Sequence, residues 1–560
     1  ANTALRMEVE AVQTPLLAAG CCAPRLRAAT RHKLACLLCC ACLFAAIASL
    51  AAALLARRIY VHAAPAYVPS VVPGWLVERL FHEDGAVSCP WTTAPAADAD
   101  CRWRRARLES LRADISTCEE PLRRNEVVYA HRGAPLITPE ETEASWEVGV
   151  RSGAGLIECD ASVTADGHLV CRHSTCDLAT TTDIVAMHPA MLSRCSRPWQ
   201  AATPATAAAP ATPAELECCT YDFSLSELSV LCATMESLID SNATRREGYL
   251  LGPPAFRSAY IARERCHPLV PFARFLTRAR EWGVGVVPEL KDTWKPGLVR
   301  FLASIGRDVD WLAESLLAQL RDAGFSGVLG GSLARRGLLQ TFDPRVATRW
   351  KQRAPAHPVL FLWKTDRLAQ AAAPCETAHF DCASSATLRR LVRLGVEVLA
   401  PPMQLLLASD GHRVRVSEGM RRLRALIAES SNATGAGAST AARTSQEGSS
   451  QVGDQVGSTS QEGSTTQVGT WSLERSGCPS ADPAASLGNQ PASTGPCGPY
   501  WAGLQGVSAF QHADTLLAID ALLGAGVAGI FSDFPAAVSA VANCRSANTQ
   551  LKSAYGGAGF

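Results

Sequence analysis

Eight short apolar runs, most of them separated by amphipathic segments, constrain the fold of this chain more than any other feature. They are rich in β-branched and aromatic residues and are bounded by turn-forming residues, as buried strands are. In order they are VVYA (127–130), GLIECD (155–160), GVGVVPELK (283–291), GLLQTF (337–342), PVLFLW (358–363), VEVLAPP (396–402), GTWSLE (469–474) and VAGIFSD (527–533). Strands that alternate with helices form parallel sheets, and eight such units close a (β/α)8 barrel. We therefore predict an α/β protein with a TIM barrel over residues 126–545.

Two long segments interrupt this pattern. Residues 174–267, after the second strand, are rich in cysteine and far longer than a crossover requires, so we expect them to form a cap insertion. Residues 433–469 consist mainly of Ser, Gly, Thr and Gln, with SQEGS and QVG repeated. Such a composition buries too little apolar surface to order, which predicts a disordered insert before the seventh strand. Residues 546–560 are expected to be a C-terminal tail.

An uncharged stretch near the N-terminus predicts membrane attachment. Residues 34–56 are long enough for a helix to cross a hydrocarbon core of roughly 30 Å. Basic residues on its N-terminal side (Arg25, Arg27, Arg31, Lys33) outnumber those on the other side (Arg57, Arg58). The positive-inside bias then makes residues 1–33 a cytoplasmic tail. We expect a retained single-pass signal anchor rather than a cleaved signal peptide, whose apolar region is usually about 7 to 15 residues long. A stem at 57–125 and the barrel would be lumenal or extracellular.

Charge and cysteine content fit that compartment. With 53 Lys and Arg against 52 Asp and Glu, and no long basic stripe, nucleic acid is disfavoured as a partner. Five cysteines crowd into about fifty residues (Cys171, Cys176, Cys195, Cys218, Cys219), which predicts disulfides whose pairing the sequence leaves open. The sequons at Asn242 and Asn432 predict glycosylation, and both signals are typical of an oxidising compartment.

Charged residues stand where the first three strands end, which is where a TIM barrel builds its active site. The first strand leads into His131 and Arg132. Residues two apart on a strand share a face, so Glu158 with Asp160, and Glu289 with Lys291, should project together. We expect three carboxylates to converge on one mouth.

A hairpin is expected to add a histidine to this group. If Asp166 and Gly167 form a two-residue turn, Asp160 lies opposite His173 and the two side chains share a face. A one-residue difference in the loop would change this register.

These residue types suit a phosphodiester site. Oxygen ligands from Glu158, Asp160 and Glu289 suit Mg²⁺ or Ca²⁺ better than zinc. His131 and His173 remain free for proton transfer. Arg132 and Lys291 suit phosphate oxygens.

The sequence resembles the glycerophosphodiester phosphodiesterase family from about residue 126 to 544. The resemblance rests on His131-Arg-Gly, Pro139-Glu-Glu-Thr, Glu158-Cys-Asp with Thr164-Ala-Asp-Gly, His173, Pro288-Glu-Leu-Lys, Thr470-Trp-Ser-Leu-Glu-Arg-Ser-Gly and Gly529-Ile-Phe-Ser-Asp-Phe-Pro.

The resemblance implies roles for these residues. Glu158, Asp160 and Glu289 would hold the cation, His131 and His173 would act as general base and general acid, and Trp471 would form an apolar wall. The family cleaves a glycerophosphodiester into glycerol phosphate and an alcohol, by attack of the neighbouring glycerol hydroxyl through a cyclic phosphate. The segment after His173 corresponds to the family's cap.

Two positions depart from the family pattern. Glu141 stands where Asn is common, which adds a negative charge, and Ser174 stands where an orienting Asp is common. Two alternatives stay open: a lysophospholipase D-type enzyme on the same barrel, which the membrane anchor favours, and a catalytically silent membrane-anchored binding protein, which Glu141 and Ser174 make plausible.

Overall fold

The computed structural model describes residues 95–206, 210–254, 257, 266–325, 331–363, 384–409, 414–443, 466–473 and 512–545. All of them lie in the larger of two compact units, residues 66–560. The predicted cytoplasmic tail (1–33), anchor (34–56) and C-terminal tail (546–560) lie outside the described residues. Within the described ranges, no helix is both long and apolar enough to span a bilayer.

All eight predicted apolar runs contain strands of one large sheet. These strands are β1 (Asn125–Ala130), β2 (Ala154–Val163), β10 (Gly285–Leu290), β11 (Leu339–Thr341), β12 (Val359–Leu362), β13 (Val398–Ala400), β17 (Thr470–Leu473) and β18 (Ile530–Ser532). A ninth strand of the sheet, β16 (Gln467–Val468), lies just before the seventh predicted run. Neighbours pair in parallel from β13 through β12, β11, β10, β2 and β1 to β18. The predicted α/β fold is confirmed to this extent.

One extended segment links the two ends of this sheet. β16 and β17 are separated only by Gly469, yet β16 pairs with β13 while β17 pairs with β18. The Gly469 amide donates to the Leu399 carbonyl, and the Ala528 amide donates to the Val468 carbonyl. The pairings therefore run round a TIM-barrel-like sheet.

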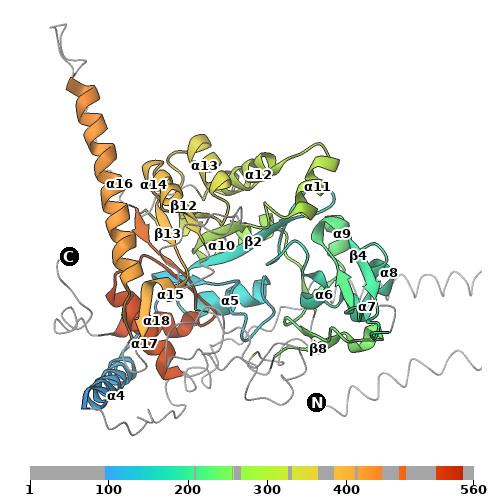
Figure 1. Cartoon of the computed structure of the whole chain (residues 1–560), viewed down its shortest axis with the longest axis horizontal. Helices are drawn as coiled ribbons and strands as arrows, with labels where there is room; N and C mark the ends of the chain where they lie inside the picture. The colour runs from blue at the N-terminus through green and yellow to red at the C-terminus, as the bar shows by residue number, and fades with distance from the viewer. Residues whose placement is uncertain are drawn as a thin grey trace, which may run out of the picture. The chain divides into compact units, whose positions relative to one another are not determined.

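Helices connect the strands and cover the outside of the sheet (Figure 1). They are α5 (Glu143–Arg151), α10 (Phe272–Trp282), α11 (Pro296–Ser304), α12 (Val309–Asp322), α13 (Pro344–Arg353), α14 (Ser385–Arg393), α15 (Met403–Leu406), α16 (Glu418–Arg443), α17 (His512–Gly524) and α18 (Pro535–Cys544). Local signals set their ends: the Thr142 hydroxyl caps α5, and Gly283 ends α10 in the left-handed conformation, with φ 64°.

Two apolar layers follow from the alternation of side chains along the strands. Val128 of β1 and Cys159 of β2 face outward, toward a core that includes Trp146 and Phe275. The opposite faces fill the barrel interior with Tyr129, Leu156, Val287, Leu338, Phe342, Leu360, Leu362, Val398, Ala400 and Phe531. The Trp146 indole also donates to the Glu158 carbonyl at 2.6 Å, which ties α5 to the end of β2.

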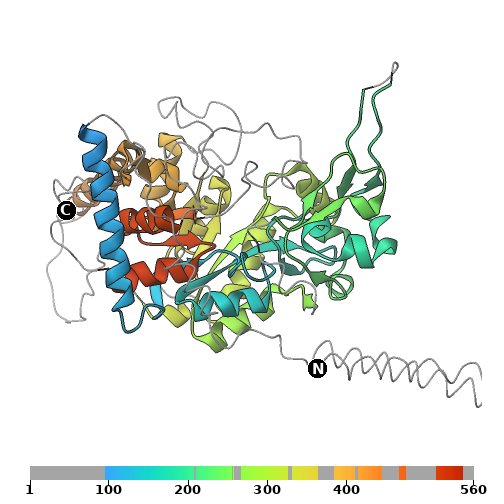
Figure 2. The same ribbon diagram turned by 90° about the horizontal axis from the view of Figure 1, so that it is seen from below.

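Part of the predicted stem belongs to the barrel domain instead. Helix α4 (Pro95–Ser116) lies against α17 and α18 (Figure 2). Its Arg107 makes two hydrogen bonds, of 2.8 and 2.6 Å, to the buried Asp520 carboxylate. The Cys118–Cys544 disulfide joins the residues after α4 to the end of α18. Arg107 thus helps to dock α4 on the barrel domain.

The Cys-rich segment, residues 174–267, follows the short strand β3 (Leu169–Cys171) and has its own small core. Its elements are α6 (Leu178–Thr181), α7 (Ile184–Met187), α8 (Pro189–Leu192), β4 (Arg197–Gln200), β5 (Glu215–Glu217), η1 (Thr220–Asp222), α9 (Leu225–Leu228), β6 (Cys232–Ala233), β7 (Leu238–Ile239), η2 (Arg246–Gly248), β8 (Leu250–Gly252) and β9 (His267–Pro268). All five crowded cysteines are disulfide-bonded, in the pairs Cys159–Cys171, Cys176–Cys219 and Cys195–Cys218, and Cys232–Cys266 adds a fourth bridge.

The tract 433–469 is not disordered at its ends. Residues 433–443 continue α16, and 466–468 lead into the barrel strand. Alanine is frequent in 433–443, and it has the highest helix propensity, so a helix that begins at Glu418 can extend through it. The repeats between 444 and 465 lie outside the described residues.

Candidate active site

Three carboxylates converge at the carboxyl ends of β2 and β10, as predicted. Glu158, Asp160 and Glu289 have carboxylate oxygens within 4.8 Å of one another, and all three side chains are buried. The strand register explains this, because Glu289 lies beside Asp160 in a parallel pairing. Each glutamate stands two residues beyond an apolar residue of the barrel interior, Leu156 or Val287.

Basic side chains and one amide hold these carboxylates. The Lys291 ammonium lies 2.9 Å from Glu289 Oε1 and 3.3 Å from Asp160 Oδ1. The Gln340 amide, on β11, donates to Glu158 at 2.8 Å and to Glu289 at 3.0 Å. Gln340 thus bridges the two glutamates across neighbouring strands.

Burial of so many acidic groups disfavours their ionised forms. Burial, with the nearby Asp160 carboxylate, raises the pKa of Glu158 well above its usual value. Burial also raises the pKa of Glu289 to about 7, although Lys291 opposes this shift. A bound cation would relieve the repulsion that causes part of these shifts.

The residues present fit a hard divalent cation. Both Asp160 carboxylate oxygens are buried and accept no hydrogen bond among the described residues, although Lys291 and Arg132 lie 3.3 and 3.4 Å from them as ion-pair partners. Oxygen-only ligands are those that Mg²⁺ and Ca²⁺ prefer. Two other groups of candidate ligands exist in the described part of the chain, but each contains a disulfide, Cys159–Cys171 or Cys176–Cys219, so their sulfurs are not free.

His131 and Arg132 lie at the same mouth, immediately after β1. His131 Nδ1 is 2.7 Å from Asp533 Oδ1, and His131 Nε2 is 3.8 Å from Glu158 Oε2. The Arg132 backbone amide donates to Glu158 Oε2 at 3.0 Å, and its guanidinium lies 3.4 Å from Asp160. The cations and carboxylates of the mouth therefore form one continuous network.

Glu140 extends this network toward the Cys-rich segment. Its carboxylate accepts hydrogen bonds of 3.3 Å from both Arg132 and Arg257. Burial opposes ionisation, but the two guanidinium groups prevail and lower the pKa of Glu140 to about 2. Arg257 thus connects residues 174–267 to the phosphate-binding candidate Arg132.

The predicted hairpin register was wrong by one residue. Ala161 pairs with Cys171, which places Arg172, not His173, opposite Asp160. The loop has three residues rather than two, because the Thr164 amide bonds to the His168 carbonyl and Gly167 takes φ 80°.

His173 lies two residues beyond β3, whose pairing with β2 ends at Cys171. It is nevertheless close enough to the mouth for the charges of Arg132 and Lys291 to act on it. Burial lowers the pKa of His173 well below its usual value, and the charges of Arg132, Lys291, His131 and Lys295 lower it further.

The two departures from the family pattern occupy different environments. Glu141 is fully buried, and its Oε1 accepts from the Asp160 backbone amide at 3.1 Å. Burial and the neighbouring acids raise the pKa of Glu141 well above normal, which favours a neutral side chain rather than the added charge we expected. Ser174 instead donates to a different carboxylate, Asp292, at 3.0 Å.

Trp471 lies on β17, but its side chain is outside the described part of the structure. Gln340, Asp533 and Glu140 belong to the site, although no role was predicted for them from the sequence. The first two carry a usable signal, because each stands two residues beyond an interior residue, Leu338 or Phe531.

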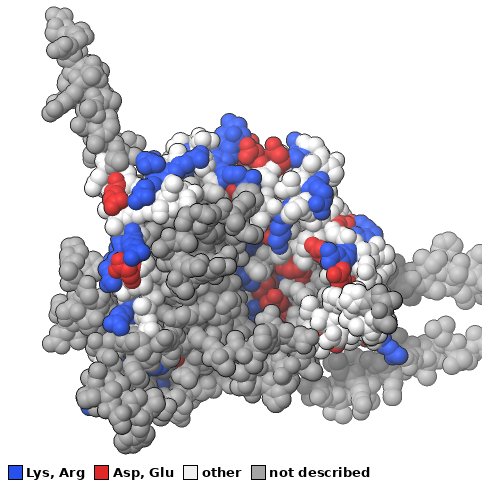
Figure 3. Space-filling model, in the orientation of Figure 1, with Lys and Arg blue, Asp and Glu red and all other residues white. Residues whose placement is uncertain are grey.

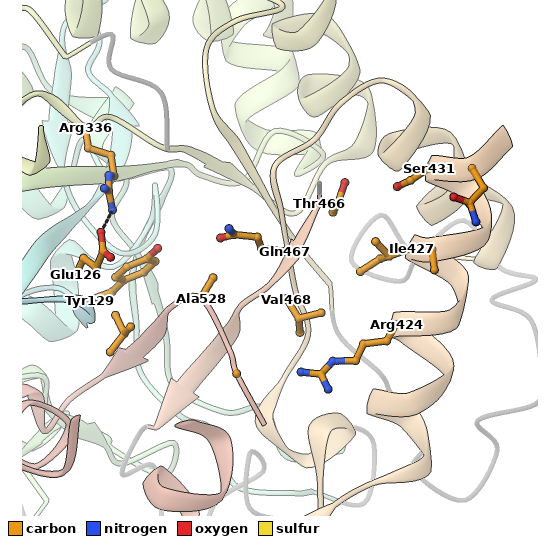
Figure 4. Close-up of a pocket in the computed structure, with 14 residues that line it drawn as sticks. Glu126, Tyr129, Arg336, Arg424, Ile427, Ser431, Thr466, Gln467, Val468 and Ala528 are labelled. Atoms are coloured by element: carbon orange, nitrogen blue, oxygen red, sulfur yellow. Dashed lines mark ion pairs between the residues drawn. The ribbon is translucent and has the colours of Figure 1, made fainter. Parts of the chain in front are cut away.

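A separate cavity of about 760 Å³ lies at the amino ends of the strands, between them and α16 (Figure 4). Glu126 and Arg336 form an ion pair of 3.0 Å on one side, and Arg424 and Ile427 lie on the other. The cavity shares no lining residue with the carboxylate mouth. On the outer face seen in Figure 3, Lys and Arg are scattered over the described residues rather than gathered into one stripe.

The fold and this mouth define a TIM-barrel-like α/β protein with a charged, buried site at the carboxyl ends of its strands. Residues 131–394 match the model of the glycerophosphoryl diester phosphodiesterase family. Residues 131–394, somewhat less than half of the chain, are therefore similar to that family.

Individual proteins are similar to this chain over shorter or more divergent stretches. A Mycobacterium tuberculosis protein named "Probable glycerophosphodiester phosphodiesterase 1" is 46% identical over 59 residues, which is 10% of this chain and 22% of the relative's length. An Oleispira antarctica phosphodiesterase in complex with the product sn-glycerol-3-phosphate is 14% identical, with a TM-score of 0.36 over 74% of this chain and 96% of that one. A glycerophosphodiester phosphodiesterase from Agrobacterium tumefaciens is 13% identical, with a TM-score of 0.34 over 75% and 99% of the two chains.

Proposed function

We propose that this protein hydrolyses glycerophosphodiesters to glycerol 3-phosphate and an alcohol. The observation that carries the proposal is the cluster of Glu158, Asp160 and Glu289 beside His131 at the mouth of a barrel that is similar to this family. When bound there, Mg²⁺ or Ca²⁺ would neutralise negative charge on the phosphoryl oxygens.

His131 is the general base in this proposal. The Asp533 carboxylate accepts a hydrogen bond from Nδ1–H, which leaves Nε2 unprotonated and directed toward the carboxylate cluster. Nε2 would take the proton from the attacking glycerol hydroxyl. Asp533 would then stabilise the positive charge that the imidazole acquires.

His173 is the general acid, and the substrate itself would prepare it. In the free protein its low pKa keeps the imidazole neutral, because it is buried among cations. A bound phosphodiester adds a negative charge beside Arg132 and Lys291, and that charge favours the protonated imidazole. His173 would then deliver a proton to the departing alkoxide, while Arg132 and Lys291 contact the phosphate oxygens. Water would then attack the cyclic phosphate, giving its proton to His173 while His131 returns a proton to the glycerol oxygen, and glycerol 3-phosphate would result.

Release of glycerol 3-phosphate from glycerophosphocholine tests this function. The protein would be produced in a secretory host and assayed with Mg²⁺, with Ca²⁺ or with a chelator. We expect cation-dependent release from the wild-type protein and none with the chelator. Absence of release from several glycerophosphodiesters by folded protein would reject the proposal and favour a silent binding protein.

A lysophospholipase D-type activity is the second candidate, and one observation favours it. Strands β7 and β8 expose Leu238, Ile239 and Leu251, each more than 40% accessible, on the Cys-rich segment. An apolar surface of this kind suits an acyl chain. Comparing kcat/KM for lysophosphatidylcholine and glycerophosphocholine decides between the two substrates. A Leu238→Ser/Leu251→Ser variant should lose only the activity on the lipid.

The compartment is a further part of the proposal. Residues 34–56 would anchor the chain in a membrane, with the barrel lumenal or extracellular. The disulfides of the described residues and the exposed Asn242 sequon support an oxidising compartment. Endoglycosidase sensitivity of the full chain, with loss of one glycan in Asn242→Gln, tests it, and an unglycosylated chain would reject it.

A further inference from the structure

The loop that follows His173 is held by one buried carboxylate from the neighbouring strand end. Asp292 Oδ2 accepts three hydrogen bonds: from the Ser174 hydroxyl at 3.0 Å, the Thr175 amide at 2.9 Å and the Thr175 hydroxyl at 2.8 Å. Its other oxygen lies 3.0 Å from the Lys295 ammonium, which also donates to Ser174. A carboxylate with this many donors fixes the backbone that leaves His173.

The backbone of Asp292 is itself constrained. The described residues contain three non-glycine positions with φ in the left-handed region, Arg132, Glu141 and Asp292, and the first two lie at the mouth. Asp292, with φ 58°, directly follows the phosphate-binding candidate Lys291. Such conformations persist where surrounding contacts enforce them, and they concentrate at functional sites.

Covalent bonds restrict the same loop on both sides. Cys171, two residues before His173, is bonded to Cys159 of β2, which stands between Glu158 and Asp160. Cys176, three residues after His173, is bonded to Cys219. Between these two anchors, Asp292 accepts from the Ser174 hydroxyl and from the amide and hydroxyl of Thr175, while Asp177 accepts from the Ser174 amide at 3.2 Å.

We propose that Asp292, two residues after β10, is a positioning residue for His173. It takes the place of the aspartate that directly follows this histidine in the family pattern, where this chain has Ser174. Ser174 is then not a lost orienting group, because it transmits the contact to Asp292. This inference rests on the proposed function, in which His173 protonates the leaving group.

The leaving group of the substrate provides the test. Two glycerophosphodiesters would be compared, one with choline and one with 4-nitrophenol as the leaving alcohol. A poor leaving group such as choline needs a general acid, whereas 4-nitrophenolate departs without one. For Asp292→Asn, which tolerates the left-handed backbone, we expect kcat for the choline diester to fall at least about tenfold. For the 4-nitrophenyl diester, we expect a change of about twofold or less.

Two variants calibrate the measurement. His173→Ala should show the same dependence on the leaving group with a larger loss on the choline diester. Asp308→Asn removes a matched carboxylate that caps α12 by accepting from the Trp311 amide, and it should change neither activity. An equal loss of both activities in Asp292→Asn, or no loss of either, would overturn the inference.

A second measurement does not require turnover. Hydrogen exchange at the Thr175 amide should accelerate at least about tenfold in Asp292→Gly, with the ring signals of His173 displaced in the NMR spectrum and the β10 amides unchanged. If the wild-type protein cleaved no diester, the proposed function would fail on its own. Unchanged exchange at Thr175 and unchanged His173 signals would separately overturn the role of Asp292.

Discussion

The two ends of the barrel use the same strands in opposite ways. At the amino end, β1 contributes Glu126 and Tyr129 to a cavity. The Glu126 carboxylate pairs with Arg336 there and is largely exposed. At the carboxyl end, β1 leads into His131 and Arg132, which lie among buried carboxylates. Burying like charges together destabilises a fold, so a cluster of this kind at one end indicates where chemistry takes place.

A substitution at each end should separate them most clearly. His131→Ala should lower kcat for glycerophosphocholine about 10³-fold, because it removes the proposed base. Tyr129→Phe, two residues earlier on the same face of β1, should leave kcat within about twofold. The pair would be assayed at saturating cation. A loss below tenfold in His131→Ala would contradict the assignment of the base.

The partner of His131 should have the next largest effect. Asp533→Asn should lower kcat about 10²-fold, because the amide neither fixes the tautomer nor stabilises the imidazolium. Cation affinity, measured by titration calorimetry, should not change. A parallel loss of affinity would mean that Asp533 supports the carboxylate cluster rather than the base.

Gln340 should affect the cation more than the chemistry. Gln340→Leu removes the hydrogen bonds that hold Glu158 and Glu289 together, and should weaken Mg²⁺ or Ca²⁺ binding about tenfold. Gln319→Leu, on α12, is the matched control and should bind normally. Unchanged affinity in Gln340→Leu would show that the glutamates need no bridge.

The smallest effect should appear in the pH dependence of stability. The folded pKa of Glu289 is about 7, above its ordinary value of 4.5, so stability falls as pH rises from about 4.5 and levels off above about 7. His173 has a lowered pKa, so its contribution is complete above about pH 6.5 and does not change in this window.

Between pH 6.5 and 8 the cation-free protein should therefore lose roughly 1 to 2 °C in Tm. Added Mg²⁺ or Ca²⁺ should restore more at pH 8 than at pH 6.5. Differential scanning calorimetry with chelator or cation makes the comparison, and a Tm independent of pH without cation would contradict it.

The hydrophobic periodicity and the residues at the strand ends predict most of the fold and the carboxylate cluster. The alternation that buries Leu156 and Val287 also places Glu158 and Glu289, so these residues could be predicted without a structure. The same rule also selects Gln340 and Asp533, although their strands do not end in clusters of charge.

Other features depend on contacts that a linear pattern does not contain. The His173 register depended on a one-residue difference in loop length, set by the conformation of Gly167. The partnership of Arg107 with Asp520 joins residues more than four hundred positions apart, and so does the pairing of Cys118 with Cys544. Asp292 lies 118 positions from Ser174, so the sequence around Ser174 does not predict their contact.

The Cys118–Cys544 bond has a consequence for the handling of the chain by proteases. It joins α4 to α18 across 426 residues, so the two edges of the barrel domain lie side by side. A single backbone cut anywhere between them would leave both fragments covalently attached, and non-reducing electrophoresis would show an intact mass. Because residues 118 and 544 lie so close together, the domain is suited to circular permutation. These two ends could be joined and new ends opened in a surface loop, without separating the strands that carry the site.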